Sequence, residues 1–142
     1  MKNGKGKFKH SNGSSYKGTW KADQKHGYGV FENPNNSSSY KGDWKYNKKE
    51  GEGEYVYPDG SWFKGEWVND VKKGEGEFHY KDSSYYIGGW IDDKRHGRGF
   101  FLNTDESWYK GDWVDDKKEG NGIFQDCNGD VWDCKWKNDK KV

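Results

Sequence analysis

Apolar and glycine positions recur at a fixed spacing along the whole chain. Two motifs alternate, a Gly-x-Gly pair and an aromatic-x-Gly-x-Trp segment. The first motif begins at Gly4, Gly27, Gly51, Gly74, Gly97 and Gly120, in steps of 23, 24, 23, 23 and 23 residues. The second spans Tyr16–Trp20, Tyr40–Trp44, Phe63–Trp67, Tyr86–Trp90, Tyr109–Trp113 and Trp132–Trp136. This spacing indicates six tandem copies of one structural unit.

Within both motifs the marked residues lie two apart, which is the period of a β-strand. We therefore expect Tyr16, Gly18 and Trp20 to share one face of a strand, and Gly27, Gly29 and Phe31 to share one face of the next. Asn-Gly pairs such as Asn12-Gly13 and Asn128-Gly129 predict tight hairpin turns at one edge. At the other edge the third residue after each Trp tolerates a left-handed backbone: Asp23, Asn47, Asp70, Asp93, Asp116 and Asp139.

Glycine weakens an isolated strand, so its regular placement among aromatic residues requires another role. We expect a ring on one strand to lie flat over the glycine of the neighbouring strand, so that one sheet buries apolar area against itself. The predicted fold is all-β, an elongated, twisted, single-layer antiparallel β-meander of tandem 23-residue β-hairpin repeats. It would form a single domain over residues 1–142, with a degenerate last repeat in which Cys134 replaces glycine.

Composition alone would have suggested a chain without a core, since Leu, Ile, Val and Phe total only 18 of 142 residues. The aromatic repeat removes that objection. A formal net charge of +1 argues against a nucleic-acid partner, which requires a net basic face. No apolar run approaches the length of a membrane span and no signal peptide opens the chain, so we expect a cytoplasmic protein.

The segment Tyr16–Gly29 reads Tyr-x-Gly-x-Trp and then His-Gly-x-Gly, and Tyr86–Gly99 repeats it. These motifs and the 23-residue period resemble the MORN (membrane occupation and recognition nexus) repeat over essentially the whole chain. Aspartate or asparagine stands where the family usually has a turn glycine, and the motif histidine is replaced at Glu50, Lys73 and Glu119. The resemblance implies a scaffold, like those of ciliary radial spokes in the axoneme, junctional membrane proteins and parasite cytoskeletal rings.

Residues that could carry catalysis or bind a metal are few. His10, His26, His79 and His96 do not recur at metal-ligand spacing, and Cys127 and Cys134 lack further partners for a zinc site. The Gly-x-Gly pairs are not followed by helices, so they are not phosphate-binding loops. We expect no enzymatic activity, no cofactor, no metal and no small-molecule substrate. A disulfide between the cysteines is not expected either.

A row of cations two residues after each turn Asp or Asn suggests a binding edge for anionic phospholipids, at roughly 1 kcal/mol per residue. The row comprises Lys25, Lys49, Lys72, Arg95, Lys118 and Lys141. The same turns carry carboxylates, including Asp23, Asp70 and Asp93, which cancel most of the field. The alternative interpretation is therefore a solvated edge with weak local ion pairs.

The second face of the predicted sheet is polar in the first two copies and becomes apolar toward the C-terminal half. The repeat itself does not require apolar residues there, so they predict a surface that binds a protein partner. This patch comprises Trp62, Tyr85, Ile87, Phe100, Leu102 and Trp108, with Ile123 and Val131 at matching positions. Curvature of the sheet or self-association could cover the same residues instead.

The strand around Trp132–Trp136 is a further candidate site, because an edge strand offers unpaired backbone to another copy or another protein. Together these features predict a non-enzymatic protein–protein interaction scaffold within a cytoskeletal or ciliary assembly. The alternative function is a peripheral adaptor on anionic phospholipid membranes.

Overall fold

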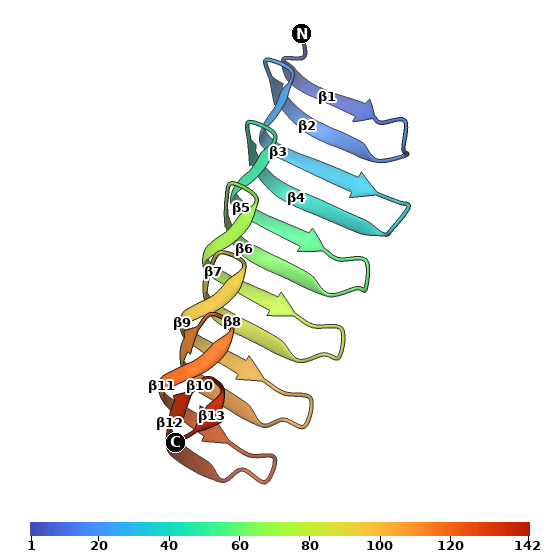
Figure 1. Cartoon of the computed structure of the whole chain (residues 1–142). Helices are drawn as coiled ribbons and strands as arrows, with labels where there is room; N and C mark the ends of the chain where they lie inside the picture. Colours follow the sequence, from blue (N-terminus) through green and yellow to red (C-terminus); the bar gives the residue numbers. More distant parts are fainter. The chain divides into compact units, whose positions relative to one another are not determined.

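The computed structural model describes residues 1–142 and contains strands, turns and loops without helix. The strands are β1 (Gly4–Lys9), β2 (Ser15–Lys21), β3 (Gln24–Asn33), β4 (Ser38–Lys45), β5 (Lys48–Val56), β6 (Trp62–Val68), β7 (Val71–His79), β8 (Tyr85–Ile91), β9 (Lys94–Leu102), β10 (Trp108–Val114), β11 (Lys117–Gln125), β12 (Val131–Lys137) and β13 (Lys140–Lys141). Strand order follows chain order throughout (Figure 1). The predicted all-β, antiparallel meander of hairpins is confirmed.

The chain divides into two compact units, Met1–Val71 and Lys72–Val142. In the first unit β1 to β6 pair antiparallel with their sequence neighbours, so that Gly6 lies opposite Gly18 and Gly29 opposite Gly42. In the second unit the same register places Gly88 opposite Gly99 and Gly111 opposite Gly122. The sequence periodicity therefore becomes rows of paired glycines across neighbouring strands.

Turns of two residues join the strands at one edge of each unit. Both residues of each turn have positive φ, as at Ala22 (49°) with Asp23 (63°) and Asp115 (49°) with Asp116 (70°). Two consecutive left-handed residues match a type I′ turn, whose twist suits an antiparallel hairpin. The prediction that the Asp or Asn positions adopt a left-handed backbone is confirmed, and the structure adds the residue before each of them.

The hairpin turns predicted at Asn12-Gly13 and Asn128-Gly129 are present at the other edge, as three-residue loops. The amide of His10 donates to the carbonyl of Ser14 (2.8 Å), and the amide of Gly13 donates back to His10 (3.0 Å). Three residues therefore form the loop. The Ser14 amide and hydroxyl both donate to Asn12 Oδ1, at 3.0 and 2.7 Å, which closes it. The predicted hairpin turn is present, and it is one residue wider than a two-residue turn because Asn12 accepts from Ser14 and does not itself adopt a left-handed backbone.

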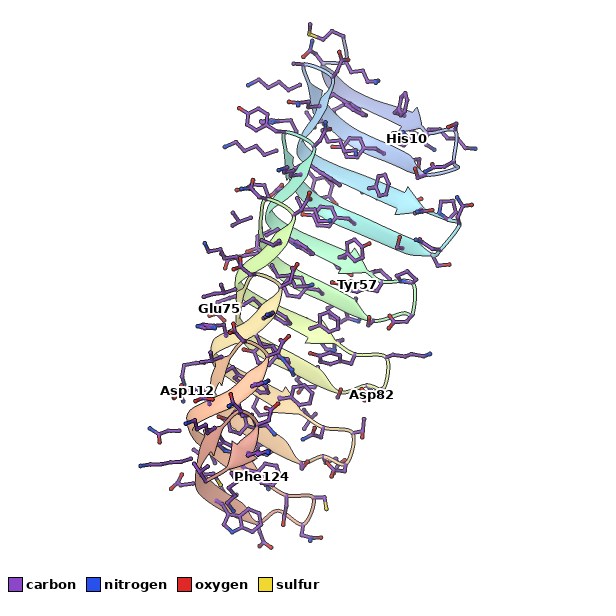
Figure 2. The ribbon with its side chains drawn as sticks, in the orientation of Figure 1. His10, Tyr57, Glu75, Asp82, Asp112 and Phe124 are labelled. Carbon is purple, nitrogen blue, oxygen red and sulfur yellow. The ribbon has the colours of Figure 1, made fainter.

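Asp82, which Figure 2 labels in the loop before β8, repeats this arrangement with a carboxylate. Ser84 donates to Asp82 Oδ1 from its amide at 2.9 Å and from its hydroxyl at 2.6 Å. The hydroxyl hydrogen bond and then the amide one lower the pKa of Asp82, because both stabilise the charged carboxylate. Equivalent serines, Ser14, Ser38, Ser61 and Ser107, are also buried in the loops.

The first glycine of each Gly-x-Gly pair has a role that the sequence did not indicate. Gly27 has φ +79°, and the pairing register shifts between Gly18 and Trp20 on the partner strand. A Cβ at Gly27 would point toward Thr19, on the face opposite Tyr16. The expectation that Gly27 shares a face with Gly29 and Phe31 was therefore wrong. A left-handed glycine at a β-bulge interrupts the alternation of faces there, and the strands change direction near the tight-turn edge (Figure 1).

The core of each unit is built from a ring lying on a pair of glycines. A Cβ at Gly29 would lie 2.1 Å from the hydroxyl of Tyr16, and one at Gly18 would lie 2.4 Å from Gly29 Cα. The Tyr16 ring is fully buried, and its hydroxyl donates to the carbonyl of Thr19 at 3.0 Å. We name the face that carries these rings the ring face. The expected packing of a ring over a glycine on the neighbouring strand is present in each unit.

Tryptophans link successive copies along the ring face. The Trp44 ring lies edge-on to Tyr40 of its own copy and to Tyr16 of the preceding copy, with centroids 5.0 and 5.6 Å apart. Its indole nitrogen donates to the carbonyl of Gly29 at 3.2 Å. In the second unit Trp113 contacts Tyr109 and Tyr86 in the same way and donates to Gly99. The buried indole N–H groups of Trp44 and Trp113 are therefore satisfied by strand carbonyls of the preceding copy.

Candidate interaction surfaces

The cation row predicted to bind lipid lies where consecutive copies join. The amide of Lys25 donates to Asn47 Oδ1 (2.8 Å), and the amide of Asn47 donates back to the carbonyl of Lys25 (3.1 Å). The same pair of bonds joins Lys49 to Asp70, Lys72 to Asp93, Arg95 to Asp116 and Lys118 to Asp139. We name this arrangement the turn clamp. Each tight turn therefore holds the cation position of the preceding copy through its backbone.

The side chains of the same row lie over aromatic rings of the ring face. Lys25 Nζ is 5.0 Å from the Trp44 ring centroid, and Lys118 Nζ is 4.6 Å from that of Trp136. Arg95 lies over Trp113 and Lys49 over Trp67, which are cation–π distances. Burial lowers the pKa of Lys25 and of Lys118, because the charged ammonium loses water. All six cations of the row therefore contact rings within the chain, including Lys141, which is exposed but lies 5.6 Å from the Trp132 ring centroid.

We expect the loss of one turn clamp to destabilise the second unit. Asp116 accepts from the Arg95 amide (2.8 Å) and from Arg95 Nε (3.2 Å) and has a left-handed backbone. Asp116→Ala should lower the free energy of unfolding by about 2–3 kcal/mol, because it removes hydrogen bonds to a charged acceptor and strains alanine. Asp116→Asn should cost less than about 1 kcal/mol, since Asn47 performs this role natively. Urea unfolding followed by circular dichroism measures both variants, and equal losses would contradict the clamp.

In the second unit the predicted apolar patch lies on the face opposite the ring face, which we name the second face. Tyr85 is opposite Leu102, Ile87 is opposite Phe100, and Trp108 is opposite Leu102 across β8, β9 and β10. Ring centroids of Tyr85 and Phe100 are 6.2 Å apart, and those of Phe100 and Trp108 are 5.7 Å apart. The structure therefore brings these five residues together as one surface, which we name the apolar patch.

The rings of the apolar patch are half-buried by one another, whereas the aliphatic residues around them are open to solvent. Ile87 is 45% exposed, Ile123 39% and Val131 55%. His79 stacks on Tyr85 with centroids 5.1 Å apart and extends the patch onto β7. Sequence reasoning missed His79, although its place opposite Tyr85 could have been found from the strand register.

Charged residues of both signs surround the apolar patch. Arg98 Nη1 lies 3.3 Å from Asp112 Oδ1 on the neighbouring strand, and Lys110 is opposite Phe100. Asp112, labelled in Figure 2, lies on β10. Trp62, the remaining predicted member, belongs to the first unit, where it lies opposite Val56. The apolar patch as defined above therefore contains residues of the second unit alone.

The predicted edge-pairing residues have different surroundings. Trp136 pairs with Lys141 of β13, so this end of β12 has strands on both sides. Its indole nitrogen is buried without a hydrogen-bond partner, unlike those of Trp44, Trp90 and Trp113. Trp132 is 42% exposed and stacks on Phe124, the residue labelled on β11 in Figure 2, at 6.2 Å.

Histidine, cysteine and carboxylate side chains do not gather into a group that could hold a metal ion. The Nδ1 atoms of His26 and His96 are buried without a hydrogen-bond partner. At the same position of another copy, Glu50 Oε2 accepts from the amide of Asn69 at 2.9 Å. Cys127 is exposed in a loop and Cys134 is buried opposite Gly122. The structure has no helix that could cross a membrane.

The structure is that of a β-hairpin repeat protein, in which buried tyrosines lie over pairs of glycines and each repeat has about 23 residues. Comparison with family models of known sequences identifies the family. The chain belongs to the MORN repeat family, whose repeat matches residues 1–15, 16–38, 40–62, 63–85, 86–107 and 109–131. The six predicted copies are thereby confirmed. No curated protein matches the sequence.

The fold is similar to that of a Drosophila melanogaster protein of known structure. The structure is described as the TCP domain of SAS-4 (dCPAP) in complex with a proline-rich motif of Ana2 (dSTIL). The similarity has a TM-score of 0.54 at 14% sequence identity and covers 87% of this chain and 66% of that one. At this identity the similarity concerns the fold alone.

Proposed function

We propose that this MORN-repeat chain is a non-enzymatic scaffold that binds a protein partner through the apolar patch of its second unit. The observation that carries the proposal is the exposed aliphatic and aromatic surface on β8 to β10, which the tyrosine–glycine core does not use. Polar side chains at positions 87 and 123 would leave the tyrosine–glycine core intact, because Ile87 and Ile123 are exposed on the second face. The presence of isoleucine at these positions therefore needs another explanation. Contiguous apolar surface of this kind is typical of an interaction site.

The composition of the patch favours a protein over a membrane as its partner. Tyr85, Phe100 and Trp108 form an aromatic centre, and aromatic residues are enriched at the centres of protein interfaces. Arg98 and Asp112 form an ion pair beside it, so the rim carries both charges. A mixed, hydrogen-bonding rim suits the polar margin of a protein interface, whereas an anionic membrane requires a cationic one.

We place this scaffold in a cytoskeletal or ciliary assembly, which is where MORN-repeat scaffolds of radial spokes and parasite cytoskeletal rings operate. The complex of the SAS-4 TCP domain with a proline-rich motif of Ana2 adds support, since a sheet of similar fold there binds a protein segment. The alternative function, an adaptor on anionic membranes, receives less support because the cation row contacts rings and turn backbone.

Two isoleucines of one strand provide the test. Ile87, in the patch, and Ile91, beside the tight turn, lie on β8 and are 45% and 42% exposed. Ile87→Lys should reduce partner binding about tenfold or more, because a buried interfacial ammonium without a partner costs about 1.4 kcal/mol or more. Ile91→Lys should leave binding unchanged. Affinity purification with quantitative mass spectrometry identifies proteins lost with Ile87→Lys alone, and titration of the purified candidate gives the affinities.

Both isoleucines are exposed, so both variants should keep the β-type circular dichroism spectrum and melt within a few degrees of the wild type. Loss of every bound protein with both variants, or of none with either, would contradict docking at the patch. Sedimentation with anionic vesicles distinguishes the membrane alternative, since that binding should weaken steeply as salt increases.

A further inference from the structure

The first strands of the chain carry a local excess of positive charge, although the formal net charge of the whole chain is only +1. Residues 1–22 contain six lysines, Lys2, Lys5, Lys7, Lys9, Lys17 and Lys21, and no aspartate or glutamate. Lys2 lies over the rings of Phe8 and Trp20 and belongs to the ring face. The other five are exposed on β1 and β2.

On the second face of the first unit these cations meet across strands. Lys7 lies directly opposite Lys17, and Lys17 lies opposite Val30 on β3, which in turn lies opposite Lys41 on β4. Lys5 is opposite Thr19 on the same face. None of Lys5, Lys7 and Lys17 forms an ion pair within the chain. Like charges directly opposite each other destabilise a strand pair, so Lys7 and Lys17 cost stability in the isolated protein.

A depression of about 620 Å³ lies among these lysines. It is lined by Lys5, Lys7, Lys17, Thr19, Tyr28 and Val30, with Gly6 and Gly18 contributing backbone. Tyr28 is 61% exposed, although the repeat requires no ring at that position. The depression is therefore lined by two apolar side chains, Tyr28 and Val30, which we name its floor, and by three cations, Lys5, Lys7 and Lys17, which we name its rim. The neighbouring acidic residues by register are Asp43, opposite Tyr28, Glu32, opposite Ser15, and Glu54, opposite Lys41, and none of them lines the depression.

We propose that this depression binds an acidic segment of a partner protein, with an apolar side chain of the segment inserted between Tyr28 and Val30 and carboxylates on Lys5, Lys7 and Lys17. Charge complementarity identifies the partner chemistry, because only anions relieve the repulsion between Lys7 and Lys17. A hollow that accommodates a side chain favours a polypeptide over a lipid surface, which would meet the rim lysines and leave the floor empty. This site is separate from the apolar patch of the second unit and does not depend on it.

The test uses the full chain and a fluorescent peptide in which pairs of glutamates alternate with single leucines. Fluorescence anisotropy should show saturable binding that weakens as salt increases from about 0.01 to 0.1 M, where the Debye length falls from about 30 to 10 Å. Lys7→Gln/Lys17→Gln should weaken binding about fivefold or more, since each exposed ion pair contributes a factor of about two to five. The same variant should melt at a higher temperature than the wild type, because the like-charge pair is gone.

The matched control is Lys45→Gln/Lys48→Gln. Lys45 and Lys48 also lie opposite each other, on β4 and β5, and both are exposed, so this variant removes the same charge outside the depression. It should bind the peptide as the wild type does. Equal weakening by both variants, or by neither, would overturn the proposal.

Three further measurements separate this site from its alternatives. A peptide with serine in place of leucine should bind more weakly, and equal binding would mean that the floor is not used. Binding to anionic vesicles that the peptide fails to displace would assign the lysines to membranes and overturn the proposal. Light scattering that shows salt-dependent self-association, lost with Lys7→Gln/Lys17→Gln, would assign them to a second copy. Ile87→Lys should leave peptide binding unchanged, so failure here and failure of the apolar patch are distinguishable.

Discussion

Gly99→Ala is expected to be among the most destabilising single substitutions in the second unit, lowering the free energy of unfolding by about 3 kcal/mol. A Cβ at Gly99 would lie 2.2 Å from the hydroxyl of Tyr86 and 2.4 Å from two of its ring carbons. The ring cannot retreat, because it is fully buried, its hydroxyl donates to the carbonyl of Gly89 at 2.9 Å, and Trp113 packs against it. Overpacking in so confined a site displaces either the ring or the strand.

Gly97→Ala is the matched control, two residues away in the same motif. Gly97 has φ +84° and no atom within 4 Å of its virtual Cβ, so alanine there suffers backbone strain without a collision. That strain should cost about 1–2 kcal/mol. Urea unfolding followed by tryptophan fluorescence and circular dichroism measures both variants. A loss at Gly97 as large as that at Gly99 would mean that backbone conformation, and not the ring, explains the glycine pairs.

The second large effect is expected at alkaline pH. Four tyrosines, Tyr16, Tyr40, Tyr86 and Tyr109, have fully or almost fully buried rings. Burial raises the pKa of Tyr16 and of Tyr109 to about 12, and it raises those of Tyr40 and Tyr86 as well, because a buried phenolate loses its water. The unfolded chain ionises near pH 10, so the unfolded state releases protons first. Stability contributed by the neutral phenols is therefore complete below about pH 10 and is lost as the pH rises toward 12.

Lys25 and Lys118 act in the opposite direction. Their lowered pKa values mean that the buried ammonium groups cost stability at neutral pH, and that this cost disappears as they lose their protons below the ordinary lysine value. The four buried phenols outnumber the two buried ammonium groups, so the free energy of unfolding should decrease overall above about pH 10.

Thermal melting between pH 8 and 12, with tyrosinate absorbance recorded alongside, measures this effect. The melting temperature should fall above about pH 10, and the buried phenols should ionise together with unfolding. Tyr86→Phe should flatten the fall, and Phe63 shows that this position accepts a ring without a hydroxyl. Ionisation of all ten tyrosines near pH 10 with the fold intact would contradict the assigned burial.

Periodicity was sufficient to predict the antiparallel hairpins, because a two-residue alternation repeated six times leaves few other folds. It was also sufficient for the turn residue Asp116, since few residue types tolerate a left-handed backbone. It could not reveal that Gly27 faces away from Gly29, because a bulge changes the face without changing the spacing. The three-residue length of the wide loops was not predicted either, because side-chain hydrogen bonds, such as those from Ser14 to Asn12, determine it.

Candidate sites were harder to predict than the fold. The apolar patch could be assembled from the register, because Tyr85, Phe100 and Trp108 stand out once the repeat is removed. The environment of Lys25 could not be predicted from the register, since only three-dimensional packing shows that its ammonium lies over Trp44. The depression around Lys7 and Lys17 depends in the same way on which lysines meet across strands and which lack a carboxylate.

The turn clamp makes the two edges of the repeat unequal in their tolerance of length. At the tight-turn edge the Asn47 amide and side chain must both reach Lys25, so an inserted residue would separate groups that are now 2.8 and 3.1 Å apart. At the wide-loop edge the Asn35 side chain donates to the carbonyl of Asn12, but the loops of consecutive copies have no paired backbone hydrogen bonds of the turn-clamp kind. The one spacing of 24 residues falls there: Asn33 pairs directly with Ser38, and the loop between them is one residue longer than the others. New segments, whether inserted by evolution or by design, therefore belong in the wide loops.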